Sequence, residues 1–274
     1  MKLLGANGWS RSALVALLYA AAAATLHADT IVVTYDAAGV QAATGAALCG
    51  TSTHCWIGEE TFTSALPGGT STYSTLLDNV GGVTGGVSGV YGAGYTRTAA
   101  NEYGGAGGTG YFADVTDSSY TVTLTSTLTV GGQTEGVNYF GLWISALDAD
   151  NILQFYNGNT LVFTWTPAQI IAGLGTCPNS SNLFCGNPNT NFLGEDNGEQ
   201  FVFLNFYDVT ATFTKIVFSE ADSSGFESDN HTVGYISSIV PVGTVFTPEP
   251  GSFALLSLGT LALIGLRRRF SRGR

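Results

Sequence analysis

Residues 120–130 read YTVTLTSTLTV, and this stretch decides the fold class. Its apolar residues alternate with five threonines, which predicts a long strand with one buried face. The apolar residues are Tyr120, Val122, Leu124, Leu128 and Val130. Further strands are predicted at residues 137–147, 152–156, 160–166, 201–207, 212–219 and 232–239. Many short strands separated by turns predict an all-β body, an antiparallel, jelly-roll-like β-sandwich.

Three local patterns refine this expectation. Residues 137–147 form a nearly continuous apolar run, which predicts a strand buried on both faces. Asn157-Gly158 lies between two predicted strands and is typical of a tight hairpin turn. Pro167 precedes AQIIAG and predicts one short helix, because proline is favoured in a first helical turn.

Residues 79–110 are rich in glycine without a strict period, which excludes collagen. A dinucleotide-binding loop is not expected, since no strand and helix flank a glycine fingerprint there. The spaced valines and tyrosines indicate either weak strands joined by glycine turns or a partly mobile region. We favour the weak strands.

The chain begins with the pattern of a secretory signal peptide over residues 1–28. Lys2 and Arg11 flank a polar lead, residues 13–24 are almost wholly apolar, and Ala28 offers a small residue for signal peptidase. Export makes disulfides the expected state of the cysteines, Cys49 with Cys55 and Cys177 with Cys185. A zinc site is the alternative, although these spacings are wider than zinc sites usually show.

The predicted body, residues 29–246, is strongly acidic. Its only basic side chains are Arg97 and Lys215, whereas nineteen of the twenty Asp and Glu residues lie within it. Such a surface repels phosphate backbones, so we expect no nucleic-acid partner. It attracts cations, or it simply keeps an extracellular protein soluble.

Residues 253–266 form an uncharged, apolar stretch near the C-terminus. As a helix it would be about 21 Å long, short of the ~30 Å hydrocarbon core of a bilayer. The cluster Arg267, Arg268 and Arg269 follows and would hold the C-terminus in the cytoplasm. We therefore predict a short transmembrane helix that acts as a marginal anchor in the inner membrane.

Pro248, Glu249 and Pro250 precede this helix, and the order of motif, apolar segment and arginine cluster resembles the PEP-CTERM sorting signal of Gram-negative bacteria. The resemblance covers residues 247–274. It implies processing by exosortase, a membrane-embedded enzyme that resembles a cysteine protease, after passage through the inner membrane. It further implies a final location at the cell surface or in the extracellular matrix, and a link to exopolysaccharide, biofilm and floc formation.

Two blocks in the body are similar to blocks in exosortase-dependent surface proteins. One spans residues 138–170 and contains FYNG, and the other is FESDNHTVGYI at residues 226–236. Ser228 stands where the second block usually has an apolar residue, so we expect that strand to be frayed or at an edge. The blocks imply a family and no activity.

Two groups of oxygen-bearing side chains suggest calcium. Asp148, Asp150 and Asn151 lie at one predicted turn, and Glu227, Asp229 and Asn230 at another. Asp and Asn are also ordinary turn formers, which is the alternative interpretation. His54, inside the first cysteine loop, and His231, at the second turn, are expected to be exposed and without a catalytic role. Calcium is the only candidate cofactor.

Three functions remain open at this point. The first is a secreted, exosortase-processed surface or matrix protein without enzymatic activity. The second is a lectin-like module for extracellular polysaccharide, calcium-dependent or not, with a sugar-binding face. That face would be lined by the strand aromatics Trp143, Phe155, Tyr156, Phe163 and Trp165, which are otherwise expected in the core. The third is a secreted hydrolase, for which no recognised catalytic motif is present.

Overall fold

The computed structural model describes residues 30–221 and 224–246. The predicted signal peptide (1–28), the Pro-Glu-Pro motif (248–250), the membrane helix (253–266) and the three arginines (267–269) lie outside these residues. Within the described ranges, no helix has both the length and the apolar character needed to cross a membrane.

The described chain consists mainly of strands. In order they are β1 (Ile31–Tyr35), β2 (Cys55–Glu60), β3 (Thr70–Thr72), β4 (Ser74–Val80), β5 (Val87–Tyr91), β6 (Thr96–Ala99), β7 (Tyr111–Val115), β8 (Ser119–Ser126), β9 (Thr129–Val130), β10 (Gln133–Thr134), β11 (Tyr139–Leu147), β12 (Ile152–Asn157), β13 (Thr160–Trp165), β14 (Gln200–Asp208), β15 (Lys215–Ser219), β16 (Phe226–Ile236) and β17 (Thr244–Phe246). The helices are short: α2 (Gly45–Cys49), α3 (Ala168–Leu174), η1 (Ala106–Gly108) and η2 (Thr190–Phe192).

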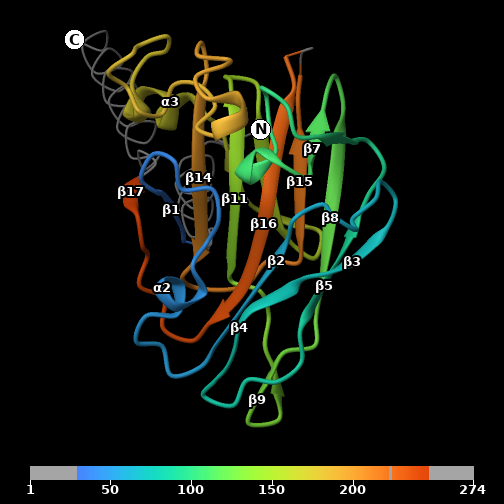
Figure 1. The fold of residues 1–274 in the computed structure, drawn as a ribbon. Coiled ribbons are helices and arrows are strands. Elements are labelled where there is room, and N and C mark those ends of the chain that lie inside the picture. Colours follow the sequence, from blue (N-terminus) through green and yellow to red (C-terminus); the bar gives the residue numbers. More distant parts are fainter. Residues whose placement is uncertain (1–29, 222–223, 247–274) are drawn as a thin grey trace, which may run out of the picture.

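The strands form two large antiparallel sheets (Figure 1). Sheet A has nine strands in the order β17-β1-β14-β11-β16-β2-β4, with β7 paired to β16 and β6 paired to β7. Sheet B has six, in the order β13-β12-β15-β8-β5-β3, and β9 and β10 form a small separate hairpin. The all-β, antiparallel prediction is confirmed. The jelly-roll-like arrangement stays a prediction.

The main core contains residues from both sheets, which therefore pack face to face. β11 shows how the strands divide their side chains: Phe140 and Leu142 join this core, whereas Trp143 joins a second cluster with Phe201 and Phe203. All nine residues of β11 are buried, which confirms the prediction of a strand covered on both faces. Sheet A is thus the central layer, with packed side chains on each side.

The other local predictions are largely confirmed. The hairpin between β12 and β13 turns at Gly158, whose φ is 57°, and α3 follows Pro167. The glycine-rich region contains β5 and β6, as expected for short strands joined by glycine turns. β8 ends at Ser126, earlier than predicted, because Ser126 Oγ bonds Glu135 O and Leu128 N instead of continuing the ladder.

The predictions for β16 are wrong in two respects. The strand begins at Phe226, six residues before the predicted start, and lies between β11 and β2 in the middle of sheet A. Ser228 is fully buried there, so this segment is neither frayed nor at an edge. The Asp-Asn pair was interpreted as a turn, but Asn230 takes a φ of 49° within the strand and the pairing with β11 shifts register nearby. These residues form a β-bulge.

Candidate functional site

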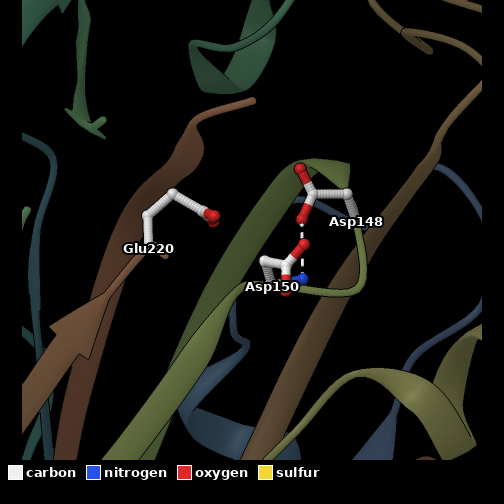
Figure 2. A group of neighbouring side chains, drawn as sticks. All are labelled: Asp148, Asp150 and Glu220. Atoms are coloured by element: carbon white, nitrogen blue, oxygen red, sulfur yellow. Dashed lines mark hydrogen bonds between the residues drawn. The ribbon is translucent and has the colours of Figure 1, made fainter. Parts of the chain in front are cut away.

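Asp148, Asp150 and Glu220 form a group of three carboxylates at one end of the sandwich. Each offers a ligand oxygen within 4.8 Å of the others (Figure 2). Asp148 and Asp150 belong to the turn between β11 and β12, and Glu220 follows the last residue of β15. Both turns cross between the two sheets, and this brings together residues that lie some seventy positions apart. Oxygen ligands of this kind suit calcium.

Asn151 holds the group together from within the protein. Its side chain is completely buried, and its Nδ2 donates to Glu220 Oε2 at 2.6 Å and to Gly225 O at 2.8 Å. Asp148 N donates to Asn151 Oδ1, and Asp150 N donates to Asp148 Oδ1 in an Asx turn. The predicted turn chemistry and the predicted oxygen cluster therefore coincide at Asp148–Asn151. Glu220 was missed, because no sequence spacing links it to this turn.

The second predicted calcium group does not form at a turn. Glu227, Asp229 and Asn230 are buried residues of β16. Asp229 Oδ2 accepts from Ala106 N at 2.8 Å and Asn230 Nδ2 donates to Gln41 O at 2.8 Å, so these two side chains fasten neighbouring loops to sheet A. Burial raises the pKa of Asp229 to about 7. Calcium binding at these residues stays a prediction.

His231 lies in the core, and the expectation of an exposed histidine is wrong. It has no exposed surface, and its ring stacks on Phe218 with centroids 4.9 Å apart. Its Nδ1 lies 3.3 Å from Tyr91 Oη and its Nε2 lies 3.1 Å from Ser228 Oγ. Burial lowers its pKa to about 3. The bulge at Asn230 explains the error, because it turns His231 toward the space between the sheets. His54, by contrast, is only half-buried.

Both predicted disulfides are present, Cys49–Cys55 and Cys177–Cys185. The first joins α2 to the start of β2. The second closes a loop in the segment between α3 and β14. Four cysteine sulfurs used in this way leave no thiolate for the alternative zinc site.

The strand aromatics belong to the core. Trp143, Phe155 and Trp165 are at most 4% exposed, and Tyr156 and Phe163 are half-buried. Trp143 lies on the opposite face of β11 from Phe140, but that face is covered too. These five residues therefore form no exposed sugar-binding strip.

Comparison with known proteins adds one finding about the C-terminal end. A family model described as the PEP-CTERM protein-sorting motif matches residues 246–269. No curated protein and no solved structure matches the chain. The matched residues include the Pro-Glu-Pro motif, the apolar segment and the arginine cluster on which the resemblance depended. Residues 246–269 therefore carry a PEP-CTERM protein-sorting motif, and this motif indicates exosortase-dependent export to the surface of a Gram-negative cell.

Proposed function

We propose that this protein is a structural component of the cell surface or extracellular matrix, processed by exosortase and without enzymatic activity. The observation that carries the proposal is the sorting motif at residues 246–269. Signal peptidase acts first, at the predicted site after Ala28, and exosortase acts later from the inner membrane. The protein is an inner-membrane intermediate between these two steps.

The position of the motif relative to the fold supports this order of events. β17 ends at Phe246, where the match to the motif begins, and Pro248 follows two residues later. Cleavage at or beyond Pro248 therefore leaves all the described strands in the released part. A sorting enzyme can remove the tail without dismantling the sandwich.

The packing of the described body supports a role without catalysis. Ser228 and His231 are near enough to form a nucleophile–base pair, but both have no exposed surface. A substrate would have to enter a close-packed aromatic core to reach them. Two disulfides and a covered central sheet suit a protein that must persist outside the cell.

The link to exopolysaccharide, biofilm and floc formation rests on the resemblance alone. No observation on the described residues favours the lectin-like alternative, because the strand tryptophans are buried. Binding of matrix polysaccharide therefore stays a secondary prediction. It is checked by retention of the purified body on the extracellular polysaccharide of the host.

The sorting function is tested by replacing Pro248, Glu249 and Pro250 together with alanine in the native host. The full-length protein should then remain in the inner-membrane fraction, because the enzyme that removes the tail no longer recognises it. Intact mass spectrometry of each cell fraction reports whether the tail has been removed.

A matched control is Pro241→Ala, which removes a proline from the body and leaves the motif intact. This control should be processed and exported as the wild type is. Equal export and equal mass of the triple-alanine variant and the control would refute exosortase processing through this motif.

A further inference from the structure

Two neighbouring buried side chains in sheet A have oxygen atoms without a hydrogen-bond partner. Ser145 of β11 lies directly opposite Glu227 of β16. Ser145 is 0% exposed and Glu227 is 6% exposed. Neither Ser145 Oγ nor Glu227 Oε2 has a partner. Because nearly all buried polar groups in proteins are satisfied, two such atoms side by side indicate a ligand that completes them.

Both side chains point to the same face of sheet A. Directly opposed residues of an antiparallel pair share a face. Phe226 belongs to the core between the sheets and contacts Phe218, so Glu227, the next residue, faces the other way. Asp114 of β7 lies opposite Glu227 on its other side. Ser145, Glu227 and Asp114 thus form a row across three adjacent strands.

This row lies beside the turn that carries Asp148. The Glu227 carboxylate lies against Gly225, where a Cβ atom would come within 2.2 Å of Glu227 Oε1. Gly225 O in turn accepts from Asn151, so Glu227 is next to the turn that carries Asp148.

The two basic side chains of the body are engaged elsewhere. Arg97 donates to Phe62 O and Thr63 O, and Lys215 lies over the ring of Tyr156. The unpartnered oxygens of Glu227 and Ser145 are therefore left for a cation from solution.

We propose that Glu227 and Ser145 bind a calcium ion on the outer face of sheet A. Glu227 supplies the buried carboxylate and Ser145 the hydroxyl, and Asp114 lies opposite Glu227 in the same row. Calcium suits the site because it takes six to eight oxygen ligands, and neither histidine nor cysteine is in the row. This site is distinct from the Asp148–Asp150–Glu220 group, although Asp148 is close to both. It does not depend on the sorting function.

The test uses the full-length protein with its disulfides intact, after metal removal with a chelator. Calcium chloride is titrated by calorimetry, and thermal unfolding is followed with and without calcium at about 1 mM, within the range for extracellular calcium modules. Glu227→Gln keeps the shape of the side chain and removes its charge. We expect this variant to lose calcium affinity by about tenfold or more, and Ser145→Ala to lose it several-fold.

One matched control and one comparison variant locate the ion. Asp117→Asn changes an exposed carboxylate on another turn and should keep the affinity within about twofold of the wild type. Asp150→Asn changes a member of the group in Figure 2 and reports calcium bound at that group instead. If Glu227→Gln does not fold, the proposal is tested by whether Ser145→Ala shows the expected several-fold loss of calcium affinity. The proposal is overturned if the wild type gains no stability from calcium, if the Glu227 and Ser145 variants bind as the wild type does, or if Asp150→Asn alone abolishes binding.

Discussion

Acidification below pH 6.5 should destabilise the protein through His231. An unfolded histidine has a pKa near 6.5, whereas the buried ring of His231 has its pKa lowered to about 3 by desolvation. Phe218 and Tyr91 stack on this ring and Ser228 closes its other nitrogen, so a proton added to it would lie in an apolar core. The folded chain therefore excludes a proton that the unfolded chain accepts.

The sign and size of the effect follow from proton linkage. Between pH 6.5 and 3 the unfolded chain binds more protons at this site, so the free energy of unfolding falls as the pH falls. One such site costs about 1.4 kcal/mol per pH unit. His231 alone should therefore cost about 2 kcal/mol between pH 7 and pH 5, and about 5 kcal/mol over the whole window. Above pH 6.5 it contributes no pH dependence.

Urea unfolding of the wild type and of His231→Gln at pH 7 and pH 5 measures this term. Glutamine can replace the hydrogen bonds but cannot take up a proton. The wild type should lose about 2 kcal/mol more than the variant between the two pH values, whatever the variant costs at pH 7. His54→Gln, which removes the other described histidine, should keep the wild-type slope. Parallel pH profiles for the wild type and His231→Gln would refute the reasoning.

Three further changes test other parts of the argument. Cys49→Ser opens the first disulfide and should lower the free energy of unfolding by about 2–3 kcal/mol, measured by urea unfolding beside the reduced wild type. Asn151→Ala removes the donor to Glu220 Oε2 and should cost about 1–3 kcal/mol; a neutral result in the same assay would contradict its role as the support of the acidic group. Replacing Arg267–Arg269 with glutamine should weaken the retention of the C-terminus in the cytoplasm, which protease accessibility of a C-terminal tag in spheroplasts would report.

The fold class could be predicted from the sequence because alternation in the second half of the chain is strong. In the stretch at 120–130 and the apolar run at 137–147, the order of apolar and polar residues alone predicts which faces of the strand are buried. β2 contains Glu59 and Glu60 and was not predicted, because it is defined by its partners β16 and β4. Short strands of this kind are fixed by tertiary pairing, which local propensity does not report.

The candidate site could be predicted only in part, for a similar reason. The turn at Asp148–Asn151 is local and was found, whereas Glu220 joins it through two crossovers between sheets. β16 was misjudged because Asp-Asn is both a turn signal and a component of bulges. Asn tolerates a positive φ, and in this strand that tolerance re-aims His231 without ending the ladder.

Whether the tail is cut before or after β17, the last strand of the body, affects how the protein can assemble. β17 covers one side of β1, pairing residues 244–246 with Val33, Thr34 and Tyr35. A cut upstream of β17 would strip this cover and leave β1 with free backbone donors and acceptors, the template on which foreign strands add. A cut downstream keeps β1 paired and leaves β17, a strand of three residues, as the edge of sheet A. A short edge strand is a poorer template than a longer one, so a shift of a few residues in processing would change how readily foreign strands add to this sheet.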